Sequence, residues 1–323
     1  MMKFIDLFSG IGGFHLAFHK LGLKCVWASE INPDARESYR RNFEKISPEI
    51  FINNNFNNDI RVLIPEDIPD FDICCAGFPC QPFSQIGKRK GFNEELEDRG
   101  NLFFYILKII REKKPKAFLL ENVQHIINHD NGNTFKTILF KLTKLGYNVF
   151  YKVLNSTQFG IPQNRERIFI ICFKKRSTYF EFPKPNIKLK SLKKILNNKL
   201  SNSEGGLSKI ALAHVNKHFK NYKKNRTKFD NPVLITEIRP SRCSIRSDGI
   251  SPCLTAKMGT GGNNIPYIID KKRVLSIREC LRLQGYPDSF KMVGSKSQSY
   301  KQIGNSVTVA VIDHLTKEIL KNL

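Results

Sequence analysis

The chain has 323 residues, of which 41% are apolar and 25% charged, the composition of a globular protein large enough for about two domains. Lysine and arginine number 53 against 29 acidic residues, and the formal charge of +24 points to a polyanionic partner, nucleic acid before an anionic membrane surface. No apolar run approaches the roughly 18 residues that a membrane-spanning helix needs, which makes a membrane the weaker choice.

The eight cysteines do not form a metal-binding or disulfide pattern. None belongs to a CxxC pair or to a paired finger spacing, so we expect no structural zinc and no other metal. Most lie within apolar, strand-like runs, which fits free thiols in a reducing cytoplasm. Asp6 and the glycines at positions 10, 12 and 13 interrupt the apolar N-terminus, which is therefore interpreted as part of the mature fold and not as a signal peptide.

Apolar, strand-like runs alternate with amphipathic, helix-like runs over the first 173 residues. The expected strands are 3–8, 24–29, 71–76, 117–120, 147–155 and 167–173, and the expected helices are 14–21, 32–43, 102–113 and 133–145. Asn32 and Pro33 form a start signal for the second helix, an N-cap followed by proline at the first helical position. The alternation predicts an α/β fold with a mainly parallel sheet covered by helices.

The character of the chain changes near residue 173. Residues 174–230 are rich in lysine and asparagine and carry more than half of the net charge. Such a segment is either a solvated surface or linker, or a surface for a polyanion. Short β-like pieces and a glycine-rich turn at 257–264 follow, and an amphipathic helix at 306–320 suggests that the chain returns to the first domain.

A glycine-rich loop, Asp6–Phe14, lies between the first expected strand and helix. It lacks the third glycine of the dinucleotide fingerprint, and a tight turn needs glycines in any case, so a cofactor site and a plain turn are equal alternatives. Glu30 ends the next strand, where an acid commonly accepts ribose hydroxyls, and Asp59 is a candidate acceptor for an adenine amino group. Taken singly, each acid is more often an ordinary surface carboxylate.

Cys80 follows the strand 71–76, within the run Gly77-Phe-Pro-Cys-Gln-Pro-Phe-Ser84. Pro79 and Pro82 cannot donate backbone hydrogen bonds, so they end the strand and hold the cysteine in a stiff turn at the carboxyl end of the sheet. A thiol at this place has the position of a nucleophile, although a single cysteine is more often part of a core.

An acid and two arginines extend this pattern. Glu121 follows the strand 117–120, which places its carboxylate at the same sheet edge as Cys80, with a capping role as the alternative. The run Gln163-Asn-Arg-Glu-Arg167 leads into the last strand, with both arginines on one face. They are suited to phosphate or carbonyl recognition or, alternatively, to a surface salt bridge.

Taken in order, these segments resemble the motifs of the DNA cytosine carbon-5 methyltransferases over nearly the whole chain. The matches are to the family's S-adenosylmethionine loop, Pro-Cys nucleophile motif, catalytic acid motif, arginine motif and two C-terminal motifs, at residues 6–14, 77–84, 121–123, 163–167, 278–288 and 302–307. A match to six motifs in the family's order is very improbable by chance.

The resemblance implies a role for each group of residues. Cys80 is the expected nucleophile and Glu121 the expected acid, with Arg167 on the base carbonyl and Arg165 on the backbone or the glutamate. The implied cofactor is S-adenosylmethionine, held by Phe8, Gly10, Ile11, Gly12, Gly13, Glu30, Ile31, Asp59, Ile60, Gly77, Pro79, Leu102, Asn305, Ser306 and Val307. The implied partner is double-stranded DNA, contacted by Ser84, Lys88, Arg89, Lys90, Asn122, Arg239, Arg242, Arg246, Thr255, Gly261 and Gly262.

The family's fold implies a Rossmann-like, S-adenosylmethionine-dependent methyltransferase domain at 1–180 with 302–323, and a smaller target-recognition domain at 181–301. The implied reaction is methyl transfer to carbon 5 of a cytosine flipped out of the duplex, through a covalent Cys80 adduct and without a metal. The basic segment 174–230 then favours DNA contact over plain solvation. We expect a cytoplasmic monomer that protects DNA from a separate restriction endonuclease.

Three other functions fit parts of the pattern. An RNA cytosine methyltransferase of the tRNA-modifying branch shares these motifs but usually carries a Cys-Phe-Thr segment, where this chain has Cys253-Leu-Thr255. A catalytically idle DNA-binding protein has no need of Cys80, Glu121 and both arginines. A nicotinamide dehydrogenase accounts for the glycine loop alone and leaves the Pro-Cys motif unexplained.

Overall fold

The computed structural model describes residues 1–52, 55–57, 59–79, 102–174, 179–196, 206–224, 228–260 and 264–323. The chain folds into two compact units, which are described separately. Unit 1 consists of Met1–Leu154, Glu166–Pro183 and Val311–Leu323, and unit 2 of Asn155–Arg165 and Lys184–Ala310. Unit 2 therefore takes in 155–165 and 302–310, besides most of the segment that the sequence assigns to a small domain.

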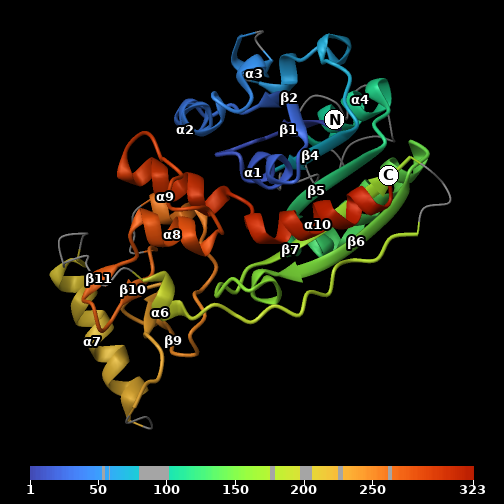
Figure 1. Ribbon diagram of the computed structural model, residues 1–323. Helices are drawn as coiled ribbons and strands as arrows, with labels where there is room; N and C mark the ends of the chain where they lie inside the picture. Colours follow the sequence, from blue (N-terminus) through green and yellow to red (C-terminus); the bar gives the residue numbers. More distant parts are fainter. Residues whose placement is uncertain are drawn as a thin grey trace, which may run out of the picture. The chain divides into compact units, whose positions relative to one another are not determined.

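Unit 1 is built on a seven-stranded sheet with the order β3-β2-β1-β4-β5-β7-β6 (Figure 1). The strands are β1 (Lys3–Leu7), β2 (Lys24–Ser29), β3 (Phe56–Asn57), β4 (Ile73–Gly77), β5 (Ala117–Val123), β6 (Asn148–Asn155) and β7 (Glu166–Phe173). The pairs β2·β3, β1·β2, β1·β4 and β4·β5 are parallel, whereas β7 runs antiparallel to β5. The expected α/β fold with a mainly parallel sheet is confirmed.

Helices connect most of these strands. They are α1 (Gly13–Lys20), α2 (Pro33–Phe43), α3 (Pro48–Ile52), α4 (Leu102–Lys113), α5 (Asn133–Lys144) and the C-terminal α10 (Val309–Lys321). The start signal of α2 is confirmed, because the Asn32 side chain accepts a hydrogen bond of 2.9 Å from the Ala35 amide directly before Pro33. The last helix begins at residue 309 and not at 306, because the backbone of Ser306 is extended.

The unit 1 core follows from the two periodicities of its elements. Alternate residues of adjacent strands, such as Ile5 and Leu7 on β1 or Phe118 and Leu120 on β5, are buried in one apolar cluster. Helix α4 adds side chains at helical spacing to the same cluster, namely Phe103, Ile106, Leu107 and Ile110. On the other face, Phe4 packs against Phe18 of α1 with ring centroids 4.9 Å apart. The sheet is therefore covered on both faces.

Strand β5 is longer than the sequence pattern indicates. The expected strand stops at residue 120, but pairing with β7 continues as far as Val123, which lies opposite Arg167. Glu121 and Asn122 thus lie within the strand and not after it. The antiparallel partner supplies the extra pairing, and nothing local in the sequence announces it.

Unit 2 contains a small antiparallel sheet and four α-helices among its described residues. The strands are β8 (Leu234–Thr236), β9 (Ser244–Arg246), β10 (Tyr267–Ile268) and β11 (Arg273–Val274), in the order β11-β10-β8-β9, and the helices are α6 (Leu192–Ile195), α7 (Lys209–Lys223), α8 (Ile277–Leu283) and α9 (Lys296–Asn305). Helix α7 packs on this sheet through Ala211 and Val215, which share a cluster with Ile235 and Tyr267. Part of the basic segment is therefore a packed helix and not a linker.

A buried ion pair fixes the turn from β11 into α8. The two terminal nitrogens of Arg273 donate to the Glu279 carboxylate over 2.8 and 2.7 Å, and both side chains are 0% exposed. Glu279 also accepts the amide of Ser276, whose hydroxyl accepts the amide of Glu279 in return, which is a capping box. The pair thus satisfies its own charges and the first turn of α8 at once.

Candidate active site

The described chain leads to the third residue of the Pro-Cys motif. Strand β4 ends at Gly77, Phe78 is buried and Pro79 is exposed. The predicted nucleophile lies just beyond, outside the described residues, as do several predicted DNA contacts: Cys80, Ser84, Lys88, Arg89, Lys90, Gly261 and Gly262.

The other cysteines of unit 1 are parts of its core. Burial raises the pKa of the Cys25, Cys74, Cys75 and Cys172 thiols, so these stay protonated at neutral pH and are poor nucleophiles. Cys74 and Cys75 lie on β4, the strand that leads into the motif, and both are 0% exposed. Within unit 1, Cys80 is therefore the remaining candidate.

Glu121 lies beside the start of this motif. In the parallel pairing of β4 with β5, Gly77 lies opposite Glu121, so the acid sits one strand spacing, about 5 Å, from a residue three positions before Cys80. The side chain of Glu121 is only 10% exposed. Sheet register thus brings the predicted acid and the approach to the predicted nucleophile to the same edge.

Arg167 holds the carboxylate of Glu121. Its Nε lies 3.1 Å from Glu121 Oε1, and its side chain is 15% exposed. Because Arg167 is opposite Val123 on the antiparallel neighbour, the two side chains are diagonal partners on one face of the sheet. The ion pair therefore fixes the orientation of the Glu121 carboxylate at this edge of the sheet.

Asn122, an expected DNA contact, is buried and hydrogen-bonded within unit 1. It is 3% exposed, and its amide donates to the Phe78 carbonyl over 2.9 Å. Its own oxygen accepts the amide of Val123. The side chain therefore ties β5 to the first residue after β4, two positions before Cys80.

Arg165 belongs to unit 2, whereas Arg167 belongs to unit 1, because the chain crosses between the units after residue 165. Arg165 is 2% exposed. Its terminal nitrogens donate to the carbonyls of Leu254 over 2.7 Å and of Ser306 over 2.6 Å. Backbone contacts are one of the two alternatives expected for Arg165, and they make it a clamp for two segments of unit 2. Its catalytic role stays a prediction.

Two buried glutamines, Gln163 and Gln284, belong to the same clamp, and no role was predicted for them from the sequence. Gln163 donates to the Leu283 carbonyl over 2.7 Å and accepts the Leu254 amide over 2.9 Å. Gln284 donates to the Ile303 carbonyl over 2.8 Å. The sequence feature that could have indicated this shared role is the alternation of Gln163 with Arg165, which places both side chains on one side of an extended segment. We call these three residues, Gln163, Arg165 and Gln284, the unit 2 clamp.

The clamp fixes the segment that carries three predicted cofactor residues. Ser306 and Val307 are buried, and the Ser306 hydroxyl bonds to Tyr286 over 2.6 Å, whereas Asn305 is exposed. A Cβ on Gly304 would lie 2.1 Å from the backbone of Thr255, itself exposed, so glycine is required there.

The three arginines expected to read bases differ in their surroundings. Arg242 is 72% exposed and lies 3.8 Å from the Glu237 carboxylate. Arg246 is already paired with Asp248, with a side chain 27% exposed. Arg239 donates to the carbonyl of the preceding residue. Arg239 and Arg242 are thus exposed, whereas Arg246 is half-buried.

The glycine loop after β1 has the strained backbone of a binding loop. Phe8, a residue with a side chain, has φ 55, and Gly10 and Gly12 have φ 54 and 85. Left-handed φ in a non-glycine residue costs free energy and is concentrated at ligand sites. A Cβ on Gly12 would lie 2.2 Å from the Phe43 ring, whereas one on Gly10 would meet no atom within 4 Å. The space over Gly10 is therefore open to a ligand.

Glu30 connects this loop to the end of β2. Its two carboxylate oxygens accept the amides of Gly10 over 2.9 Å and of Asn32 over 2.8 Å. Burial raises the pKa of Glu30. Next to it Ile31 is 61% exposed, so its side chain is available to cover a bound ring. These features fit an adenosine moiety, with the carboxylate for the ribose and Ile31 and Phe8 for the base.

Other predicted cofactor residues have different surroundings. Ile11, Gly13 and Ile60 are buried, so the side chains of Ile11 and Ile60 serve the core and only their backbone can contact a cofactor. Asp59 binds Arg61 with both oxygens, the shorter contact being 2.6 Å. Leu102 is half-buried at the start of α4.

Asp6, at the centre of the sheet beneath this loop, is a buried acid that the sequence did not single out as titrating. It is 0% exposed, and burial raises the pKa of its carboxyl to about 8. Its Oδ2 has no hydrogen-bond partner among the described residues. Asp6 is therefore mostly a neutral acid at pH 7.

Comparison with known proteins identifies the class. The family model for C-5 cytosine-specific DNA methylases matches residues 2–321, and the chain belongs to this family. The protein is similar to the type II methyltransferases M.HaeII of Haemophilus aegyptius, 43% identical over 99% of this chain and 93% of the relative, and M.HhaI of Haemophilus parahaemolyticus, 39% identical over 100% and 95%. Among solved structures, a DNMT2 mutant of Spodoptera frugiperda has the same fold, with a TM-score of 0.73, 22% identity and coverage of 99% and 100%.

The expected family, fold and type of enzyme are thus confirmed. In the described ranges, no cluster of three or more histidine, cysteine or acidic side chains is placed to bind a metal ion. None of the helices described has the length and apolar character needed to cross a bilayer.

Proposed function

We propose that the protein transfers a methyl group from S-adenosylmethionine to carbon 5 of a cytosine in a specific double-stranded DNA sequence, through a covalent adduct with Cys80. The observation that supports this most is the Glu121–Arg167 pair, held at the sheet edge in register with the start of the Pro-Cys motif. Family membership supplies the reaction class.

Each residue of the proposed site has a separate role in the reaction. Carbon 5 of cytosine is a weak nucleophile, so the Cys80 thiolate adds to carbon 6 and makes carbon 5 enamine-like. Glu121 supplies a proton to the ring nitrogen as the thiolate adds, and Arg167 fixes the carboxylate and faces the base carbonyl. Once carbon 5 carries the methyl group, it loses its proton to a base, the ring nitrogen returns its proton to Glu121, and Cys80 leaves as a thiolate, which restores the ring. Asn122 holds Phe78, two residues before Cys80, in place through a hydrogen bond to its carbonyl.

The residues that would hold the cofactor lie around the open space over Gly10. Glu30 accepts the ribose hydroxyls with lone pairs not used by the two amides, and Ile31 and Phe8 cover the adenine. S-adenosylmethionine supplies an electrophilic methyl group on a sulfonium. The carboxylate of Glu30 also suits a cationic ligand.

The target cytosine must leave the duplex, because a cysteine on a loop cannot reach carbon 6 of a stacked base. We assign DNA reading to a smaller domain at 181–301, with Arg239, Arg242, Arg246 and Thr255 as contacts, and catalysis to 1–180 with 302–323. Of the reading residues, Arg239 and Arg242 have the exposure that a bidentate base contact requires. The proposed enzyme is a cytoplasmic monomer, and its methylation protects DNA from a separate restriction endonuclease.

Plasmid DNA from a host without other cytosine methylation tests the proposal. Bisulfite sequencing after expression of the wild type should show one short sequence protected from conversion. Cys80→Ser should leave that sequence unprotected, while Cys243→Ser, a change at a thiol in unit 2, should protect it. Complete conversion in the wild-type sample contradicts the proposed DNA substrate, and methylated transfer RNA in the same cells supports the RNA alternative.

A further inference from the structure

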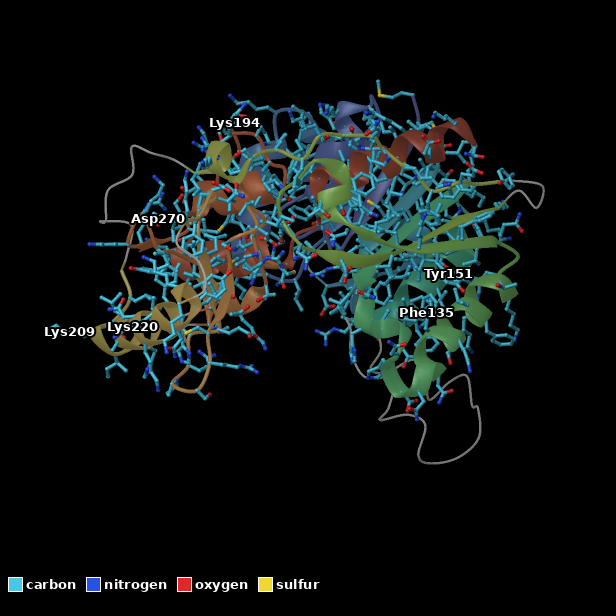
Figure 2. All side chains as sticks on the ribbon, turned by 90° about the horizontal axis from the view of Figure 1, so that it is seen from below. Phe135, Tyr151, Lys194, Lys209, Lys220 and Asp270 are labelled. Carbon is cyan, nitrogen blue, oxygen red and sulfur yellow. The ribbon has the colours of Figure 1, made fainter. Side chains whose placement is uncertain are left out.

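Helix α7 carries a row of lysines on the face opposite its packed face. Its packed positions are Ala211 and Val215, which are 3% and 0% exposed. At 100° per residue, four exposed lysines lie within about 80° of one another, on the side of the helix opposite this packed face. Three belong to the helix, and the fourth directly follows its last residue. They are Lys209, Lys217, Lys220 and Lys224. We call them the α7 lysine row; Lys209 and Lys220 are labelled in Figure 2.

No acid neutralises this row locally. The sequence has no acidic residue from 205 to 229, a stretch that holds seven lysines and arginines. None of the four lysines has an ion-pair partner among the described residues. Four neighbouring like charges repel one another, so the row lowers the stability of the helix unless a polyanion is bound.

The helix itself is anchored well enough to present these charges. Ser208 caps its first turn, accepting the Ala211 amide over 3.2 Å. Near the other end, the Tyr222 hydroxyl bonds to Ser247 over 2.9 Å, and the His218 ring bonds to the Pro240 carbonyl over 3.1 Å. The lysine row is therefore on a fixed element and not on a loose loop.

We propose that the α7 lysine row binds the phosphate backbone of duplex DNA that flanks the methylated site, a contact that adds affinity without reading sequence. The proposal rests on the proposed function, because DNA is the partner. From Lys209 to Lys224 the row extends about 22 Å, which matches roughly six phosphates along one strand. The lysine ammonium group, at the end of a long flexible side chain, is suited to phosphates and does not make the bidentate contacts that read bases.

The test compares two variants with the same change in charge. Lys209→Ala/Lys217→Ala/Lys220→Ala removes three members of the row at solvent-facing positions, and Lys45→Ala/Lys136→Ala/Lys152→Ala removes three exposed lysines of unit 1. Filter binding is measured over a salt series with two duplexes that carry the bisulfite-mapped site, one barely longer than the site and one with long flanks. Thermal unfolding checks that both variants fold.

The wild type should bind the long duplex more tightly than the short one. The α7 variant should lose that difference, and its slope of log Kd against log salt on the long duplex should fall by about 0.9 per lost contact, up to roughly 2.7. Single-turnover methylation of saturating short duplex should be unchanged in both variants. Equal slopes and equal length dependence in the two variants overturn the proposal, whereas absence of methylation by the wild type contradicts the proposed function itself.

Discussion

The two units of this protein are stabilised and charged in different ways. Unit 1 packs alternating apolar residues of a central sheet under helices, and by sequence it carries 27 lysines and arginines against 22 acids, a net of +5. Unit 2 adds buried polar contacts, the clamp and the Arg273–Glu279 pair, to its own apolar cluster, and it carries 26 against 7, a net of +19. The proposed catalytic residues Cys80 and Glu121 thus lie in the unit whose charge is nearly balanced, and most of the positive charge lies in the other unit.

The largest effect should come from the acid of unit 1. Glu121→Gln keeps the shape of the side chain but removes the proton donor, so the methylation rate should fall about 100- to 10,000-fold. Dissociation constants for DNA and cofactor should stay close to the wild type, because the polar contact with Arg167 is retained in part. Rapid-quench measurement of labelled methyl transfer, beside equilibrium binding, checks this. A rate near that of the wild type contradicts general acid catalysis by Glu121.

A stability experiment probes the polar core of unit 2. Glu279→Gln leaves the Arg273 guanidinium buried without its counter-charge, which should lower the free energy of unfolding by about 3–5 kcal/mol. Asp288→Asn breaks the more exposed Arg282–Asp288 pair and should cost less than about 1 kcal/mol. Chemical denaturation of both variants gives the comparison, and similar costs for the two show that the buried pair is not a special support of unit 2.

Arg165 of unit 2 and Arg167 of unit 1 lie only two residues apart, and their substitutions should change different measured quantities. Arg165→Lys loses hydrogen bonds to the Leu254 and Ser306 carbonyls, so stability should fall by about 1.5–3 kcal/mol. Arg167→Lys loses the fixed contact to Glu121, so the rate should fall with little change in stability. Denaturation and single-turnover rates of the two variants are compared. The reverse pattern, with the rate lost in the first and stability in the second, refutes these assignments.

The buried acid beneath the glycine loop gives a smaller, pH-dependent effect. Asp6 has a pKa of about 8 in the folded protein, above the usual value of an aspartate, so the folded state holds the proton more tightly. Its contribution to stability is complete at low pH and is lost as pH rises from about 4 towards 8. Asp6→Asn should therefore flatten the fall in unfolding free energy between pH 5 and 8. A profile as steep as that of the wild type assigns the fall to other groups.

The sequence predicts the unit 1 sheet well because its signals are local. Strand and helix periods, and the Asn32–Pro33 start of α2, need no distant partner. The partners of Asn122 and Arg165 could not be predicted, because a motif names a residue without the direction of its side chain. The carbonyls that Arg165 binds lie 89 and 141 residues further along the chain, and such partners leave no local pattern.

DNA containing 5-fluorocytosine at the methylated position tests the central claim most directly, because fluorine at carbon 5 cannot leave as a proton and the Cys80 adduct cannot resolve. With S-adenosylmethionine present, the wild type and Cys243→Ser should give a shifted band on a denaturing gel, and Cys80→Ser should give none. A shifted band from Cys80→Ser, or no band from an enzyme that methylates ordinary DNA, contradicts the covalent mechanism.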